Sequence, residues 1–369
     1  MLDLSYYMPT RIFYGEGCVA AHKEYFAALG KRCLIVTGKH SAKASGALDD
    51  VTKALDDEGI TYEIFDQIPQ NPLLSVCKAG GDAARQMGAE FIVGIGGGSP
   101  LDASKAVSVF ASNEMAPEQI FDGNYSNAPL PLILVGTTAG TGSEVTPYAV
   151  LSVDTQGETV PRKRSVRGLF ANACFCDYRY TMTLDYGFTI ATALDALSHC
   201  IEGYFSKKAN TISDEFAKKG AKLIVDVFQD LSGDGTFTRK QREKLYAASI
   251  YGGLTITQTG TCYCHAMGYF LTEDYHIPHG IACAVYLPSY LQRGCEVDAQ
   301  KADALLFELE EPVSSLCSMI ENVADFKPLH LTQDEKNALC ERWTAVNKFA
   351  TSPGEFTVDD AMDLVEDLF

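Results

Sequence analysis

The sequence predicts an N-terminal α/β domain with a mostly parallel sheet, followed by an all-helical domain. Two observations support this fold class. In residues 1–180, short apolar runs alternate with amphipathic stretches, which is typical of a parallel sheet covered by helices on both faces. In residues 181–369 the periodicity is helical and β-branched runs are few. A chain of 369 residues is long enough for two domains, each with its own core.

Three apolar runs in the first domain are expected to form buried strands. They occupy residues 33–37, 91–95 and 132–135, and each is followed by glycine or small hydroxyl residues. Amphipathic patterns over residues 48–58 and 75–87 predict helices between them. Because ligands of parallel sheets bind at the carboxyl ends of the strands, the three following loops are candidates for a binding edge.

The second domain is expected to consist of successive helices. Helical patterns cover residues 189–206, 213–231 and 238–254, and the loop 232–236 separates the last two of these. Breaks at Pro328 and Pro353 divide the remainder of the chain.

Charge and composition exclude several classes of partner. The formal net charge of −18 argues against nucleic acid, which needs a basic surface. No apolar stretch approaches about 20 residues, so we expect no membrane span. The N-terminus lacks the basic and apolar regions of a signal peptide, which predicts a cytoplasmic protein.

The twelve cysteines are expected to be reduced thiols of the core. The chain is long and its cysteine spacing is irregular, which is not typical of a disulfide framework. Two Cys-x-Cys pairs occur, Cys174 with Cys176 and Cys262 with Cys264, but one intervening residue is the wrong spacing for a structural zinc knuckle. We therefore interpret both pairs as packing residues.

A glycine-rich loop follows the second predicted strand and opens a helix. Residues 96–98 are all glycine, and Ser99 follows them. Without side chains, Gly97 and Gly98 would let the backbone approach a ligand, and their N–H groups would face an anion at the helix N-terminus. The loop indicates a phosphate site; the alternative is a turn needed only for packing. A second loop of glycine and threonine, residues 136–146, reinforces the first interpretation.

The loop after the first strand bears on the choice of dinucleotide. Enzymes that prefer NAD usually carry an acidic residue there, which binds the ribose 2′-hydroxyl. This chain has Gly38 at that position, with Lys39 and Ser41 beside it. The absence of an acid and the nearby ammonium and hydroxyl groups favour NADP(H), although NAD(H) stays possible. The alternative for Lys39 is a solvated surface lysine.

Three histidines and one aspartate form a candidate metal site. Asp195 and His199 are four residues apart, which places both on one face of a predicted helix. The other two are His265 and His279, which Pro278 separates into different helices. Nitrogen and oxygen ligands of this kind suit Fe(II) or Zn(II). The alternative for the first pair is a hydrogen-bonded Asp–His pair in the core.

His276 is a second candidate for chemistry. It lies three residues before His279 and is a candidate proton relay and catalytic residue. A surface histidine is an equally good interpretation of this position.

Taken together, these stretches resemble the iron-containing (group III) alcohol dehydrogenases. The resemblance begins at Tyr7-Met-Pro-Thr-Arg and continues through GGGSPLDASK, TTAGTGSEVTPYAV and the Asp-Ala-Leu-Ser-His-Cys-Ile-Glu-Gly-Tyr segment. It ends at His265-Ala-Met-Gly and Ile-Pro-His-Gly-Ile-Ala-Cys-Ala, and so covers about residues 6 to 290.

The resemblance implies a fold and a set of site residues. The fold is a Rossmann-like domain and a helical domain with a cleft between them, as in dehydroquinate synthase, and we expect a homodimer. The metal ligands would be Asp195, His199, His265 and His279. The residues implied to contact the cofactor are Gly97, Gly98, Ser99, Asp102, Thr137, Thr138, Thr141 and Lys163.

Two departures from the family pattern matter. Gly38 replaces the acidic residue of NAD-preferring members, as in members that use NADP. Some members carry a histidine four residues after the third ligand, where this chain has Tyr269, so a proton relay at that position is not implied here.

The resulting prediction is a metal-dependent oxidoreductase that transfers a hydride between NADP(H) and a small primary alcohol or diol, or its aldehyde. Two alternatives remain at this point. One is an NAD-using, metal-dependent cyclase or lyase that resembles dehydroquinate synthase. The other is a nucleotide-binding redox sensor without catalytic activity.

Overall fold

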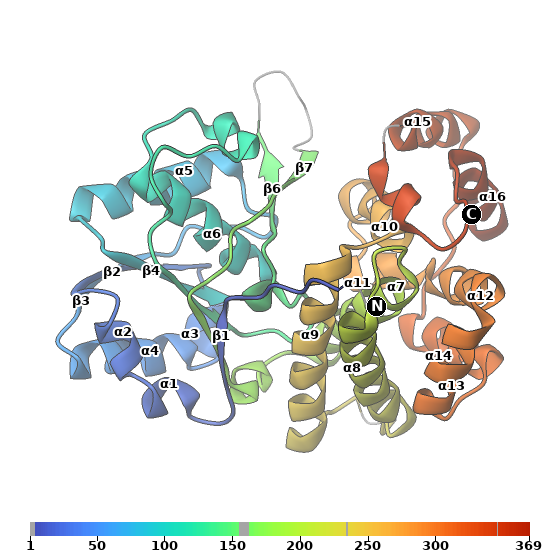
Figure 1. Cartoon of the computed structure of the whole chain (residues 1–369), viewed down its shortest axis with the longest axis horizontal. Helices are drawn as coiled ribbons and strands as arrows, with labels where there is room; N and C mark the ends of the chain where they lie inside the picture. The colour runs from blue at the N-terminus through green and yellow to red at the C-terminus, as the bar shows by residue number, and fades with distance from the viewer. Residues whose placement is uncertain (1–3, 155–161, 234, 345) are drawn as a thin grey trace. The chain divides into compact units, whose positions relative to one another are not determined.

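A computed structural model describes residues 4–154, 162–233, 235–344 and 346–369 (Figure 1). The chain divides into two compact units. One comprises Met8–Leu184, and the other comprises Asp185–Phe369 together with the N-terminal segment that ends at Tyr7. Within the second unit, the Tyr6 hydroxyl donates a hydrogen bond to the carbonyl of Leu254 at 3.0 Å, which attaches this segment to the helices.

The first unit contains a six-stranded sheet in which every neighbouring pair is parallel, as predicted. The strand order is β1-β8-β5-β4-β2-β3. The three strands expected from the sequence are β2, β4 and β5. The strands of this sheet are β1 (Arg11–Tyr14), β2 (Arg32–Thr37), β3 (Thr61–Phe65), β4 (Phe91–Gly96), β5 (Leu132–Gly136) and β8 (Ala173–Cys176).

The strand order reverses between β2 and β4. The chain passes from β2 outward to β3, and then from β4 outward in the opposite direction to β5. In the register, Thr37 pairs with Ile95 and Gly96 pairs with Gly136, so β2, β4 and β5 end at the same edge. A reversal of this kind opens a crevice at the carboxyl ends of the strands, where ligands of open α/β sheets bind.

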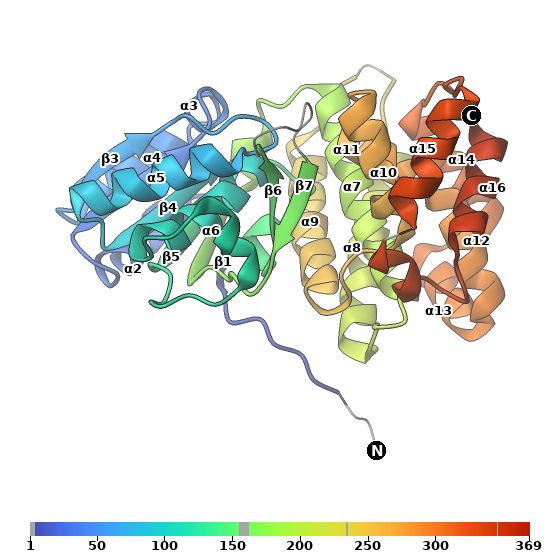
Figure 2. The same cartoon turned by 90° about the horizontal axis from the view of Figure 1, so that it is seen from above.

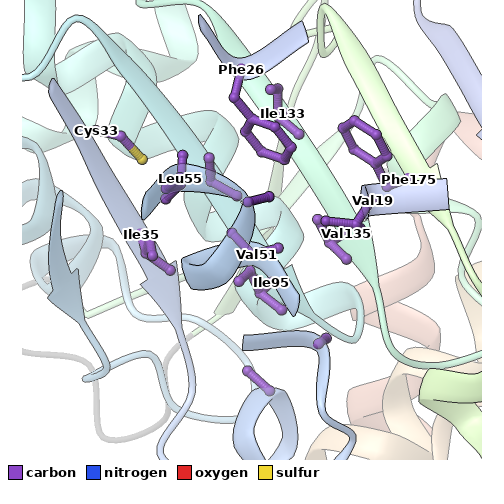
Figure 3. Close-up of a cluster of buried hydrophobic side chains, with 14 of the residues drawn as sticks. Val19, Phe26, Cys33, Ile35, Val51, Leu55, Ile95, Ile133, Val135 and Phe175 are labelled. Atoms are coloured by element: carbon purple, nitrogen blue, oxygen red, sulfur yellow. The ribbon is translucent and has the colours of Figure 1, made fainter. Parts of the chain in front are cut away.

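Helices cover both faces of the sheet (Figure 1). Alternate strand residues point to one face, where Ile35, Ile95, Val135 and Phe175 pack with side chains of the first four helices (Figure 3). On the other face, Gly94 of β4 lies against Ser104 of the last helix of this unit. The helices are α1 (Cys18–Ala21), α2 (Glu24–Ala27), α3 (Ser41–Ala44), α4 (Ala47–Asp57), α5 (Leu74–Met87) and α6 (Gly98–Ser112).

A small antiparallel hairpin lies outside the main sheet, and the sequence analysis did not predict it. It pairs β6 (Ala149–Val153) with β7 (Arg162–Val166). Three 3₁₀-helices complete the unit: η1 (Pro117–Asp122), η2 (Ser143–Val145) and η3 (Tyr178–Thr181).

The second unit is helical, as predicted. Its three longest helices are α7 (Tyr186–Phe205), α8 (Thr211–Gln229) and α9 (Arg239–Thr259), which pack against one another (Figure 2). Each begins at a polar residue whose side chain accepts a backbone N–H of the first turn; these residues are Asp185, Asn210 and Thr238.

The remaining helices follow one another along the chain and are joined by short connections. The predicted break at Pro278 is present, because this residue immediately precedes α11. The helices are α10 (Tyr263–Asp274), α11 (His279–Ala284), α12 (Leu287–Val297), α13 (Ala299–Leu309), α14 (Val313–Ala324), α15 (Gln333–Trp343), η4 (Asn347–Thr351) and α16 (Val358–Leu368). Among the helices of the described residues, none combines the length and apolar character that a membrane crossing would require.

Candidate metal centre

The structure brings the four predicted metal ligands together inside the helical unit. Asp195 and His199 lie one turn apart on α7, and the carboxylate Oδ1 is 3.7 Å from the imidazole Nε2. His265 of α10 places its Nε2 3.4 Å from the same Oδ1. The ring centroid of His279, at the start of α11, is 5.5 Å from that of His265. The cluster therefore joins three helices that are separate in the sequence.

These distances suit ligands of one cation. Bonds from Zn(II) to nitrogen or oxygen are about 2.0–2.2 Å, which puts neighbouring ligand atoms of a tetrahedral site roughly 3.3–3.6 Å apart. Two measured pairs, at 3.4 and 3.7 Å, lie at or near this range. The side chains of Asp195 and His265 are only 6% and 3% exposed, so water can form few hydrogen bonds with them.

Two atoms of the cluster carry unmet hydrogen-bonding capacity. Within the described part of the chain, Oδ1 of Asp195 and Nε2 of His265 are buried and have no hydrogen-bond partner. Burying a carboxylate oxygen and an imidazole nitrogen in this way costs free energy. A divalent cation between them would offset that cost, so the donor set fits a metal.

Electrostatics inside the cluster favour an ionised Asp195. Burial alone would raise the pKa of this carboxyl, but His199, His265 and His279 together hold it well below its ordinary value. The pKa of His265 is raised despite burial, because Cys283 and Glu202 face its ring. In this cluster, protons on the imidazoles balance the negative charge of Asp195. A bound metal cation would displace those protons and balance the same charge.

Glu202 contacts the side of the His265 ring that points away from Asp195. The sequence analysis did not identify this residue. Its carboxylate is fully buried on α7 and pairs with Nδ1 of His265. It also accepts the backbone N–H groups of Cys262 and His265, each at 3.2 Å. Because an ionised carboxylate can only accept, Nδ1 carries a proton, which leaves Nε2 as the atom that would bind a cation.

Gly280 explains how His279 reaches the cluster. A Cβ atom on Gly280 would lie 1.7 Å from the carbonyl oxygen of Ala191 and 2.7 Å from the amide nitrogen of Asp195. Only glycine lets the backbone of α11 approach α7 this closely. The residue after the histidine therefore sets the distance between the two helices that carry predicted ligands.

Tyr269, Cys283 and Thr272 also contact His279, and the Thr272 hydroxyl lies 3.2 Å from its Nδ1. The Tyr269 ring stacks on it with centroids 5.3 Å apart, and the ammonium of Lys348 lies 4.8 Å from the centroid of Tyr269. Cys283 lies one turn after His279 on α11, with its Sγ 3.8 Å from Nε2. The sequence analysis treated the cysteines as core thiols, although the four-residue spacing from His279 was a usable signal.

His276 lies apart from the cluster of ligand atoms. It is exposed in the loop between α10 and α11, with a positive φ of 58°. Its predicted catalytic role stays a prediction.

Several predicted cofactor residues of the α/β unit lie at the edge where the strand order reverses. Gly38 follows β2 directly, and Lys39 and Ser41 are exposed beside it. Gly97 and Gly98 follow β4. The two loops thus flank the reversal between β2 and β4, which is the expected binding point of such a sheet.

The loop after β5 packs closely on the glycines. A Cβ on Gly97 would lie 2.9 Å from Thr138, and one on Gly98 would lie 2.8 Å from Thr141. The hydroxyl of Thr137 is buried and has no hydrogen-bond partner within the residues that the structure describes. Thr138 and Thr141 therefore lie against the glycine loop, and the Thr137 N–H donates to the Gly96 carbonyl at 2.9 Å.

Asp102 has a role inside the protein. Its carboxylate accepts hydrogen bonds from the Ser143 hydroxyl at 2.5 Å and from the Val150 N–H at 2.8 Å. Lys105, which is fully buried, lies 3.6 Å from it and donates to the carbonyls of Ser143 and Tyr148. These contacts fix the loop after β5 to helix α6, so Asp102 holds in place the edge at which the glycine loops lie.

Two other predicted cofactor residues lie on neighbouring elements. The Ser99 hydroxyl accepts the N–H of Asn71 at 3.2 Å. Lys163 lies on β7, where it pairs with Ser152 in the antiparallel hairpin and not in the parallel sheet. The roles of both toward a cofactor stay predictions.

Comparisons with known proteins agree with this geometry. Residues 9–178 match the profile of iron-containing alcohol dehydrogenases, and residues 189–363 match the C-terminal profile of the Fe-containing alcohol dehydrogenase family. The crystal structure of an iron-containing alcohol dehydrogenase from Thermotoga maritima is 34% identical, covers 99% of both chains and superposes with a TM-score of 0.90.

Two more distant relatives differ in the cofactor named for them. A sulfoacetaldehyde reductase from Bifidobacterium kashiwanohense, solved in complex with NAD+, is 26% identical over 100% of this chain and 99% of its own, with a TM-score of 0.88. An NADPH-dependent butanol dehydrogenase from Clostridium saccharobutylicum is 26% identical over 86% of this chain and 82% of its own.

Both family profiles, the fold of each unit and the clustered Asp and His residues lead to the same assignment. The chain belongs to the iron-containing alcohol dehydrogenase family and is an oxidoreductase.

Proposed function

We propose that this protein transfers a hydride between NADP(H) and a small primary alcohol or diol, or its aldehyde, with one divalent metal held by Asp195, His199, His265 and His279. The observation that carries the proposal is the buried cluster in which Asp195 Oδ1 lies within 3.7 Å of two imidazole nitrogens. Family membership favours this function over the cyclase and the sensor considered above.

A bound divalent cation would supply a Lewis acid for the alcohol or aldehyde oxygen. The residues of the chain have separate tasks around it. Asp195 contributes the negative charge of the ligand set, and three imidazoles complete it. Glu202 fixes the orientation and the tautomer of His265. This arrangement holds the ligand atoms in place before substrate binds, so little reorganisation is needed during the reaction.

NADP(H) is proposed on the α/β unit at the edge between β2 and β4. Backbone N–H groups of Gly97 and Gly98, at the N-terminus of α6, would face the pyrophosphate. Gly38, Lys39 and Ser41 would accommodate the 2′-phosphate, because none of them repels it. Relatives that name NAD+ and NADPH both exist, so the preference needs its own measurement.

Metal analysis combined with turnover tests the proposal. We expect about one divalent metal per chain, oxidation of NADPH with short aldehydes, and loss of turnover when a chelator removes the metal. His265→Ala should lose metal and turnover but keep NADPH binding, measured by nucleotide fluorescence. Full turnover in a metal-free preparation would overturn the mechanism. The expected homodimer also stays a prediction, which sedimentation velocity would test.

A further inference from the structure

Cys283 lies beside the four residues of the candidate metal site, although it is not one of the predicted ligands. It follows His279 by four residues on α11, so the two side chains share one helix face. Its Sγ is 3.8 Å from Nε2 of His279, and the residue is fully buried. The thiol therefore faces the cluster and not solvent.

The distances place the sulfur within reach of the same cation. Asp195, His265, His279 and Cys283 each offer one ligand atom, and these four atoms all lie within 4.8 Å of one another. With bonds of about 2.0–2.3 Å, ligand atoms of one five-coordinate ion are roughly 2.8 to 4.6 Å apart, from neighbouring to opposite positions. The sulfur thus meets the same geometric condition as the Asp195 carboxylate and the His265 and His279 imidazoles, whereas His199 is not a member of this group of four.

The unpartnered atoms of the cluster give an independent indication of a bound ion at this place. Oδ1 of Asp195 and Nε2 of His265 are both buried and, within the described ranges, without a hydrogen-bond partner. Both belong to the group of four that includes Cys283. A cation bound by all of them would offset the cost of burying these atoms.

The backbone holds Cys283 in this position. Helix α10 crosses α11 at Gly268, where a Cβ atom would lie 3.1 Å from the amide nitrogen of Cys283 and from the carbonyl of Ala282. The same helix carries His265. The contact that brings His265 to the cluster therefore also fixes the starting point of the Cys283 side chain.

We propose that the Cys283 thiolate is a fifth protein ligand of the metal and biases the site toward Zn(II) relative to Fe(II). The proposal rests on the metal site of the proposed function. Thiolate is a softer ligand than imidazole or carboxylate, and soft ligands select zinc among the available divalent ions. Coordination releases the thiol proton to solvent, so metal binding should liberate one more proton in the wild-type protein than in a Cys283→Ser variant.

X-ray absorption of the Zn(II)-loaded full chain tests the ligand directly. Sulfur lies at about 2.3 Å from zinc, whereas nitrogen and oxygen lie at about 2.0–2.2 Å. We expect one sulfur in the wild-type shell and only nitrogen and oxygen in Cys283→Ser. Cys317→Ser is the matched control: Cys317 is a buried thiol of the same unit, near the Pro288 carbonyl and outside the cluster, and its variant should keep the sulfur.

A competition experiment measures the proposed preference for Zn(II) over Fe(II). Metal-free wild-type and Cys283→Ser proteins are equilibrated with mixed Zn(II) and Fe(II) under anaerobic conditions, and the bound metals are counted. We expect the Zn/Fe ratio to fall in the variant, because loss of the thiolate should weaken the binding of Zn(II) more than that of Fe(II); an unchanged ratio would overturn the proposed preference.

The outcomes separate this proposal from the proposed function. A wild-type zinc shell without sulfur overturns the thiolate ligand while leaving the metal site intact, and so does sulfur that persists in Cys283→Ser. Protein that binds no metal overturns both. The wild-type spectrum shows whether any thiolate is bound, and the comparison with Cys283→Ser shows whether that thiolate is Cys283.

Discussion

Glu202 and His265 form a fully buried pair in which the carboxylate holds Nδ1 of the imidazole while Nε2 faces Asp195. The pair connects α7 with α10, because the same carboxylate also accepts the His265 N–H. One acidic side chain thereby fixes the position, the rotation and the tautomer of a predicted ligand.

Replacing this carboxylate should weaken metal binding without unfolding the protein. Glu202→Gln keeps the side-chain volume and an acceptor for the N–H groups of Cys262 and His265, but removes the charge. We expect metal affinity to fall about 10–100-fold, the usual effect of losing a charged partner of a metal ligand. Chelator competition measures this affinity. Glu296→Gln, an exposed position on α12, is the control and should leave it unchanged. Equal affinity in both variants would show that Glu202 serves packing alone.

Gly280 should be intolerant of any side chain. In Gly280→Ala the new Cβ would lie 1.7 Å from the Ala191 carbonyl, so α11 must move away from α7. We expect a loss of about 1–3 kcal/mol or more in the free energy of unfolding, as for other overpacked sites, and a lower metal content because His279 moves with α11. Urea unfolding and metal analysis test both effects.

Gly233→Ala is the matched control for Gly280→Ala. A Cβ on Gly233 would meet no atom within 4 Å, so this variant should stay within about 0.5 kcal/mol of the wild type. Normal stability and metal content in Gly280→Ala would mean that the helices do not pack as closely as described.

The sequence was sufficient to predict that these Asp and His side chains lie together, and particular residues show why. Asp195 and His199 are four residues apart within a clear helical pattern, and histidine is rare in this chain. The prediction that Pro278 separates the helices of His265 and His279 is confirmed. The carboxyl ends of the strands also indicated where the glycine loops gather, since that rule depends on chain direction alone.

What the sequence could not predict are contacts between distant segments. Glu202 lies three residues after His199 on the same helix face, but nothing local shows that it faces a histidine 63 positions away. Cys283 lies in a helix of six residues, too short for its periodicity to indicate which side is buried. The sequence also gives no sign that Lys105 is buried, yet backbone carbonyls of a loop some 40 residues later hold it in the core.

The cofactor preference should depend on Gly38. In Gly38→Asp a carboxylate would stand where the 2′-phosphate is proposed, and repulsion should lower the NADP/NAD ratio of kcat/KM at least about tenfold, equivalent to about 1.4 kcal/mol. A Cβ here would lie 3.3 Å from the Ile68 carbonyl, so a small shift is needed. Gly38→Ala introduces the same Cβ without the charge and should keep the ratio. Steady-state kinetics with NADP and NAD measure this ratio in each variant. An unchanged ratio in Gly38→Asp would show that Gly38 does not determine the cofactor preference.

Glu335 should make the helical unit sensitive to acid. Its carboxylate accepts hydrogen bonds from the N–H and hydroxyl of Thr332 and from the Tyr275 hydroxyl, each at 2.7 Å. These bonds lower the pKa of Glu335 from 4.5 to about 2. A pKa that is lower in the folded state means that the charge stabilises the fold at pH values above 4.5 and that this stabilisation is lost as pH falls toward 2.

Glu335→Gln isolates this contribution, because the amide keeps an acceptor for Thr332 but cannot ionise. We expect the wild type to have a higher Tm than the variant at pH 6, a difference that narrows below pH 4.5 and nears zero close to pH 2. Thermal unfolding across this range measures it, with Glu341→Gln, an exposed position on α15, as the control. A Tm difference that stays constant between pH 6 and pH 2.5 would contradict the prediction, because only an ionised Glu335 can lose its advantage when it takes up a proton.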